Sequence, residues 1–226
     1  MTAIWWIRRD LRLHENLTLQ AALEHGAVVP LFIIDPYFDS VPARRRGFLI
    51  NNLKSLDASL QAHGGRLIVR RGEPVEVLRQ VMAESGAQII CAEEDFTPYA
   101  RQRDAAVQAV LPVSLIQGQT VHHPLAVMKS DGTPYTVYTP YSKTWKALLP
   151  EVQDKVDAAW SISTPAVLRS EALPEFPQDA HFPAGEAEAQ RRLSAFIDSA
   201  VFAYGEDRNR MDLEGTSALS PYLHYG

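Results

Sequence analysis

Residues 3–12 read AIWWIRRDLR, so five apolar residues run directly into charged ones. A short apolar run rich in aromatic and β-branched side chains is typical of a strand buried on both faces of a sheet. Such a strand delivers the polar residues that follow it to the edge of the sheet. Residues 27–34 (AVVPLFII) repeat the pattern and end at an Asp-Pro pair. We expect both runs to be core strands.

Helical patterns separate these two runs from three further ones. Strands are expected at residues 66–70, 87–93 and 112–116, and helices at residues 17–26, 43–64, 74–85 and 98–110. Strands that alternate with helices form βαβ units, whose strands are parallel and whose helices cover both faces. The sequence therefore predicts an α/β fold, a five-stranded parallel Rossmann-like doubly wound sheet.

Composition limits the kind of protein this is. The 226 residues are 46% hydrophobic and 22% charged, as in an ordinary soluble globular protein. The net charge of -5 argues against a nucleic-acid-binding surface on this segment by itself. Cys91, the only cysteine, lies in an apolar run, so disulfides and a cysteine-based metal site are excluded. Adjacent His122 and His123 would point to opposite faces of a strand, so no metal site is expected.

The N-terminus predicts neither export nor membrane insertion. No long apolar segment follows Met1, so neither a signal peptide nor a membrane span is expected. We expect a cytoplasmic, monomeric protein.

A parallel sheet binds ligands beyond the carboxyl ends of its strands, and residues 8–16, 35–46 and 93–101 should lie there. The cluster at residues 8–12 (RRDLR) could bind a ligand or form an ion-pair network. Three arginines at residues 44–46 suggest a nucleic-acid patch at first sight. Because they oppose the dipole of the helix that they begin, a local anionic partner is attractive.

The pattern changes in the second half of the chain. A Ser-Asp-Gly turn at residues 130–132 and a helix through Trp145 precede a proline-rich stretch with little periodicity. A surface-running linker fits that stretch. An amphipathic helix follows at residues 186–203. We therefore expect an α/β domain at residues 1–149, a linker at 150–185 and the start of a helical domain at 186–226.

Residues 215–221 (GTSALSP) bring a glycine, three hydroxyls and unhindered backbone N–H groups into one turn. Ser220 can act as the N-cap of a helix and Pro221 fits its first position. Helix starts of this kind bind phosphate, although many such stretches are ordinary caps. The sequence stops five residues after Pro221, so a site would be started here and not completed.

Several stretches, taken together, resemble the photolyase and cryptochrome family. They follow one another in the family's order and at its spacing: residues 6–16 (WIRRDLRLHEN), 31–36 (LFIIDP), 42–49 (PARRRGFL), 95–104 (DFTPYARQRD), 133–145 (TPYTVYTPYSKTW) and 204–226. The resemblance implies an α/β domain that can hold a light-harvesting pigment and an all-helical domain that holds FAD and receives DNA. This chain would supply the first domain and the opening of the second. In the family, residues matching the cluster at 8–12 join the two domains, which favours the ion-pair network.

The resemblance implies roles for residues near the end of the chain. The FAD contacts would be Tyr204, Thr216, Ser217, Ala218, Leu219 and Ser220, and Arg208 would face DNA. The hydroxyls and N–H groups can donate to a diphosphate, and Tyr204 can pack on the cofactor. The plainer alternatives are a helix-end aromatic at Tyr204 and a solvated arginine at Arg208.

The resemblance also implies an antenna site. In relatives with a flavin or deazaflavin pigment, residues matching Asp35, Arg45 and Asp95 surround it. Relatives that use methenyltetrahydrofolate carry an Asn-Glu pair where this chain has Tyr99 and Ala100, so the flavin or deazaflavin type is favoured. The sequence leaves open whether any pigment binds.

The implied activity of the parent protein is that of a deoxyribodipyrimidine photolyase acting on damaged DNA. Reduced FAD excited by blue light passes an electron to a flipped-out pyrimidine dimer, which splits. No catalytic residue is expected in this part, so the chain alone should be inactive. The alternatives are a cryptochrome-like blue-light photoreceptor and a stand-alone nucleotide- or pigment-binding module.

Overall fold

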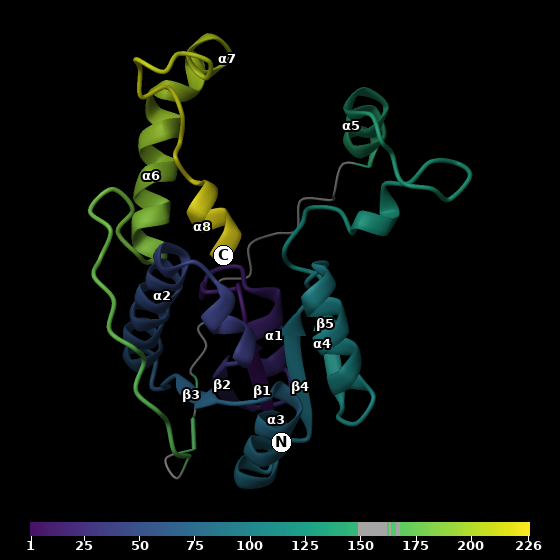
Figure 1. Cartoon of the computed structure of the whole chain (residues 1–226), viewed down its shortest axis with the longest axis vertical. Coiled ribbons are helices and arrows are strands. Elements are labelled where there is room, and N and C mark those ends of the chain that lie inside the picture. The colour runs from purple at the N-terminus through teal and green to yellow at the C-terminus, as the bar shows by residue number, and fades with distance from the viewer. Residues whose placement is uncertain (149–161, 163, 166–167) are drawn as a thin grey trace.

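The computed structural model describes residues 1–148, 162, 164–165 and 168–226 (Figure 1). Its centre is a five-stranded sheet in the order β3-β2-β1-β4-β5, and every neighbouring pair is parallel. The predicted fold is confirmed. The strands are β1 (Thr2–Ile7), β2 (Ala27–Ile34), β3 (Ile68–Arg71), β4 (Ile89–Glu93) and β5 (Val113–Ile116).

The helices fall between and after the strands. Those of the sheet region are α1 (Leu17–Leu23), the 3-10 turn η1 (Pro36–Ser40), α2 (Ala43–Ala62), α3 (Pro74–Ser85) and α4 (Pro98–Gln108). Later in the chain come η2 (Pro124–Ala126), α5 (Tyr138–Ala147), α6 (Glu186–Asp198), η3 (Ala200–Phe202), α7 (Tyr204–Asp207) and α8 (Ser220–Tyr225).

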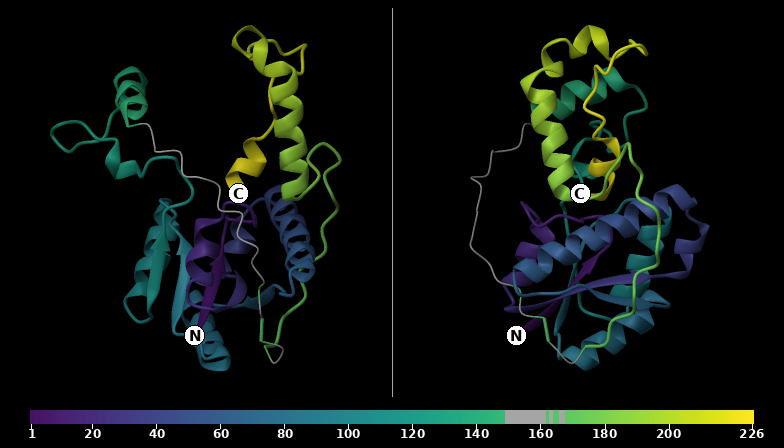
Figure 2. Two further views of the ribbon diagram at one scale, coloured as in Figure 1. Left: turned by 180° about the vertical axis from the view of Figure 1, so that it is seen from behind. Right: turned by 90° about the vertical axis from the view of Figure 1, so that its left-hand side faces the viewer.

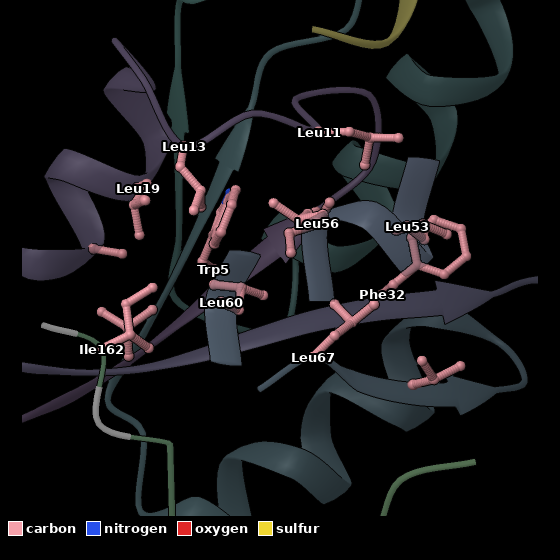
Figure 3. Close-up of a cluster of buried hydrophobic side chains, with 14 of the residues drawn as sticks. Trp5, Leu11, Leu13, Leu19, Phe32, Leu53, Leu56, Leu60, Leu67 and Ile162 are labelled. Atoms are coloured by element: carbon pink, nitrogen blue, oxygen red, sulfur yellow. The ribbon is translucent and has the colours of Figure 1, made fainter. Parts of the chain in front are cut away.

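Alternate residues of β1 feed two separate cores, because successive side chains of a strand point to opposite faces. Trp5 and Ile7 pack with α1 and α2, and the close-up in Figure 3 shows Trp5 among leucines of both helices. Ile4 and Trp6 pack on the other face with α3 and α4. All four side chains are at most 2% exposed, so β1 is the buried centre that its apolar run predicts.

Residues 150–185 were expected to form a surface-running linker, but several of those that the structure describes pack against the sheet domain. The described residues of this stretch form no helix or strand, but Ile162 and Leu168 are buried, one in each core. The backbone N–H of Val69 donates to Ser170 Oγ (2.9 Å), and that of Glu171 donates to the Val69 carbonyl (2.9 Å). The stretch therefore covers the free edge of β3. The predicted boundary at residue 149 lies outside the described residues.

Residues 117–147 leave the sheet and carry the expected turn. Met128 and Pro134 form an antiparallel bridge around it, and Gly132 has a φ of 77°. The predicted helix follows as α5, which has no buried residue and stands away from the sheet (Figure 1).

Residues 186–226 form a C-terminal arm over the carboxyl ends of the strands (Figures 1 and 2). The predicted helix at 186–203 is shorter than expected, since α6 ends at Asp198 and η3 follows. Its apolar side is not covered: Leu193 is 38% exposed and Ile197 52%. The arm folds back so that the N–H of Leu11 donates to the Tyr225 carbonyl (2.8 Å).

The predicted cap at Ser220 is wrong by one residue. Ser220 is the first residue of α8, and Leu219 holds the N-cap position without a side-chain hydrogen bond. Leu219 already has near-helical angles (φ −84°, ψ −8°), so the helix begins before the hydroxyl could cap it.

Within the described part of the chain, no helix has both the length and the apolar character needed to cross a membrane.

Candidate functional site

A cavity of about 470 Å³ lies at the carboxyl edge of the sheet, between the ends of β1, β2 and β4 and beneath α8. We call it the edge cavity. It brings together the three residues expected around a pigment, Asp35, Arg45 and Asp95. Its other walls are largely aromatic or cationic: Trp6, Arg8, Arg9, Phe38, Tyr37, Tyr99, Arg103, His224 and Tyr225.

Asp35 follows β2 and has a partner for each oxygen. Oδ1 accepts the N–H of Phe38 (3.2 Å) and so caps η1, and Oδ2 accepts the Tyr99 hydroxyl (2.7 Å). The Tyr99 ring stacks on Tyr37, with ring centres 4.2 Å apart and planes 16° from parallel. The carboxylate is thus tied to an aromatic pair of which sequence reasoning named Tyr99 alone, and only for the absence of the Asn-Glu pair.

Tyr99 is held as a hydrogen-bond donor. Burial raises the pKa of its phenol, and the hydrogen bond to Asp35 and the charge of that carboxylate raise the pKa further. The guanidinium of Arg103 lies 5.6 Å from the Tyr99 ring and 4.9 Å from the Trp6 ring. A layered wall of rings and cations therefore runs from half-exposed Tyr37 to buried Trp6.

Asp95 supplies a fixed negative charge. Burial opposes its ionisation, but the hydrogen bond from the Thr97 backbone (2.9 Å) and the charge of Arg9, 3.5 Å away, outweigh burial and lower its pKa. It stays ionised at neutral pH.

The three arginines at the start of α2 have different surroundings. Arg44 pairs with Asp179 (2.9 Å) and Arg46 with Asp39 (3.2 Å). Arg45 lines the edge cavity and, among the described residues, has no carboxylate within 4.0 Å. Two of the three charges are therefore already partnered, which disfavours a nucleic-acid patch here.

The cluster after β1 is an ion-pair network, the interpretation preferred from sequence. Arg8 pairs with Asp104 (2.5 Å), and Arg12 approaches Glu93 (4.0 Å). Asp10 is fully buried and accepts the indole N–H of Trp5 (2.6 Å). Burial, followed by the charge of Asp10, raises the pKa of Glu93 to about 7.

The same segment joins the sheet to the C-terminal arm. The backbone N–H groups of Leu13 and His14 donate to the carboxylate of Glu186 at the start of α6 (2.9 and 3.2 Å). Together with the Leu11 bond to Tyr225, these contacts tie residues 11–14 to the arm, and the domain-joining role implied for residues 8–12 stays a prediction.

The predicted FAD loop lies open on the arm. Thr216 and Ser220 are exposed, and Ser217, Ala218 and Leu219 are partly exposed. In the described structure, none of the three hydroxyls has a hydrogen-bond partner. Ala218 has a φ of 51°, a left-handed conformation that costs about 1–2 kcal/mol for a residue with a Cβ.

Tyr204 and Arg208 lie on or next to α7, at the far end of the arm. Tyr204 is 41% exposed and packs edge-on against Phe196 (5.7 Å), as the plainer interpretation expects. Arg208 is exposed. A Cβ on Gly215 would lie 2.4 Å from the Cβ of Asp207, so the loop begins directly against α7. A second hollow, of about 490 Å³, lies between α6 and α8, and Leu219 lines it.

The two histidines contact different groups. His123 Nε2 lies 3.2 Å from Glu94 Oε2, and the His122 ring meets Trp145 (4.9 Å). The described residues contain no group of three or more side chains suited to a metal ion.

Comparisons with known proteins fit this geometry. The sequence model of the family described as DNA photolyase matches residues 3–159. The chain belongs to this family. Photolyases and cryptochromes are both among its relatives, and the five-stranded parallel sheet is that of their N-terminal domain.

Individual relatives cover nearly the whole chain. An uncharacterized 31.6 kDa protein of Synechococcus is 36% identical over 99% of this chain and 84% of its own length. The deoxyribodipyrimidine photo-lyase of Thermus thermophilus is 32% identical over 98% of this chain, which spans 51% of that enzyme. Cryptochrome-2 of Gallus gallus is 28% identical, and 44% of it is covered.

Solved structures of the photolyase and cryptochrome family match equally well. A class III photolyase from Agrobacterium tumefaciens superposes with a TM-score of 0.83 at 33% identity, over 98% of this chain and 50% of that one. A Synechocystis cryptochrome has the same TM-score at 24% identity, which shows the shared fold alone. The chain thus spans about half the length of the photolyases that it matches.

Proposed function

We propose that this chain is the N-terminal part of a deoxyribodipyrimidine photolyase, a monomeric cytoplasmic protein that repairs cyclobutane pyrimidine dimers by electron transfer from reduced FAD. Residues 1–149 would be the antenna domain, 150–185 the linker and 186–226 the start of the helical FAD domain. Relatives bearing that enzyme name, 32–33% identical over nearly the whole chain, support the proposal. The observation that carries it is the edge cavity, where the three residues expected around a pigment meet.

The edge cavity would hold the antenna pigment. Its rings favour a flat aromatic ligand, and the open cation of Arg45 favours a negatively charged group on it. A flavin or deazaflavin fits these walls, and the Tyr99-Ala100 pair argues against methenyltetrahydrofolate.

The C-terminal arm would begin the FAD site. The unpartnered hydroxyls of Thr216, Ser217 and Ser220 suit a diphosphate, because they can donate without breaking internal bonds. Ala218 and Leu219 would contact the cofactor through their backbones, and Tyr204 would pack on it. When bound, reduced FAD supplies the electron for dimer splitting. Exposed Arg208 would face the DNA.

The test is a light-dependent repair assay with a thymine-dimer oligonucleotide. We expect no turnover by this chain, because no catalytic residue is assigned to it, and turnover by a parent protein loaded with FAD. Repair by the chain alone above the dark control would overturn the expected inactivity. A parent that does not take up FAD would overturn the photolyase assignment.

Two observations support alternative functions. The cryptochrome relatives favour a blue-light photoreceptor, which would bind dimer-containing DNA no better than undamaged duplex. The short Synechococcus relative, most of whose length this chain covers, favours a stand-alone pigment-binding module. A near-ultraviolet or blue absorption band that survives dialysis of this chain supports an occupied edge cavity in either case.

A further inference from the structure

One side chain in the edge cavity makes two contacts that a ligand would otherwise make. The Tyr99 ring lies flat against Tyr37, and its hydroxyl donates to Asp35 Oδ2. Stacking on an aromatic face and donating a hydrogen bond to a carboxylate are what orient a flat heteroaromatic ligand in a cavity.

The two bonds of Asp35 differ in how easily they can be given up. The N–H of Phe38 on Oδ1 is part of the turn η1, so losing that bond would unfold the cap. The Tyr99 bond on Oδ2 depends on the side chain alone. Rotation of Tyr99 about its Cα–Cβ bond, in the first turn of α4, frees both Oδ2 and the face of Tyr37.

Arg103 already lies against the Tyr99 ring at the α4 side of the cavity. Its guanidinium lies against both Tyr99 and Trp6, the latter buried at the base of the wall. Half-exposed Tyr37 and partly buried Tyr99 both line the cavity, so the pair can separate without opening either core.

We propose that Tyr99 is an internal competitor for the ligand of the edge cavity, and that the ligand is a flat heteroaromatic ring with an N–H donor at its edge. To displace Tyr99 the ligand must replace both contacts, the stack on Tyr37 and the hydrogen bond to Asp35 Oδ2. A ring without the N–H leaves Asp35 Oδ2 without a donor and binds more weakly. The inference rests on the proposed pigment role of this cavity.

The test compares two probes, riboflavin, which has an imide N–H, and N3-methylriboflavin, which lacks it. Each is titrated by fluorescence against the wild-type chain and the Tyr99→Phe variant. We expect Tyr99→Phe to bind riboflavin about tenfold more tightly, since a competing hydrogen bond to a charged acceptor is gone. Its affinity for N3-methylriboflavin should rise by a similar factor, because the same competing bond is gone, and in both proteins riboflavin should remain the tighter of the two probes.

Two variants complete the design. Tyr138→Phe, at a tyrosine that is 76% exposed on α5, should bind both probes like wild type. Asp35→Asn, whose amide retains a carbonyl oxygen for the cap, should remove most of the preference for riboflavin over its methylated form.

The outcomes separate this inference from the proposed pigment role. Equal or weaker riboflavin binding by Tyr99→Phe, with clear binding by wild type, would show that Tyr99 assists the ligand and would overturn the inference alone. Equal affinity of wild type for the two probes would also overturn it, since the N–H would then be irrelevant. No flavin binding by any variant would overturn the inference and the flavin role together.

Discussion

The edge cavity and the predicted FAD loop on the arm both carry polar groups, but those groups differ in whether they have hydrogen-bond or ion-pair partners. In the edge cavity, the carboxylates of Asp35 and Asp95 have partners supplied by β-strand ends and helix starts. In the loop, three hydroxyls have no partner within the described chain, and Ala218 is strained. The packed sheet therefore fixes the positions of its carboxylates, whereas no contact within the described chain fixes the hydroxyls of the loop.

The largest expected effect is a loss of stability when a buried carboxylate of the sheet domain is removed. Asp10→Ala should lower the free energy of unfolding by about 3–5 kcal/mol. The substitution leaves two buried donors, the indole N–H of Trp5 and the backbone N–H of Arg8, without an acceptor. Urea unfolding measures it. Asp198→Ala, at the exposed end of α6, is the matched control and should change little. Equal losses would mean that the network is no more important than the surface of the arm.

The second prediction concerns pH. Since the pKa of Glu93 is about 7 in the folded chain and near 4.5 when unfolded, the folded state holds an extra proton between these values. Stability should therefore fall as pH rises from about 4.5 to 7, by about 3 kcal/mol. Urea unfolding across this range should show a flatter dependence for Glu93→Gln. Exposed Glu76→Gln should keep the wild-type slope, and a slope unchanged in Glu93→Gln would contradict the assignment.

The sequence predicted features that have a local signal and missed contacts between residues far apart in the chain. The strands and sheet helices were predictable because apolar runs and helical spacing are local signals, and Asp35, Arg45 and Asp95 came from the family resemblance. The Tyr37–Tyr99 stack was missed, since it joins η1 to the first turn of α4, two elements far apart in sequence. The burial of Ile162 was missed too, because no periodicity marks a residue packed against the bare backbone of Gly65.

A smaller effect on ligand binding is expected at the arginines that begin α2. Arg45→Ala should weaken binding of flavin mononucleotide about threefold while leaving riboflavin nearly unchanged, because an exposed cation contributes modestly to an anionic group. Arg44→Ala is the matched control, since Arg44 pairs with Asp179. Fluorescence titration at low salt measures both. Equal losses in the two variants would point to general charge attraction.

The smallest effect lies on the arm. Phe202 is 86% exposed, so Phe202→Ser should change the free energy of unfolding by less than about 0.5 kcal/mol. A clear loss in urea unfolding would mean that this face is covered in solution, for example by a second copy of the chain, and the contrast with the sheet would weaken.

The most direct measurement of the central claim is equilibrium dialysis of the chain against riboflavin, comparing two variants. Retention should be lost when the edge cavity is changed by Tyr37→Ala combined with Asp35→Ala, and unchanged when the loop carries Thr216→Ala, Ser217→Ala and Ser220→Ala together. Retention that survives the cavity changes and disappears with the loop changes would contradict the account.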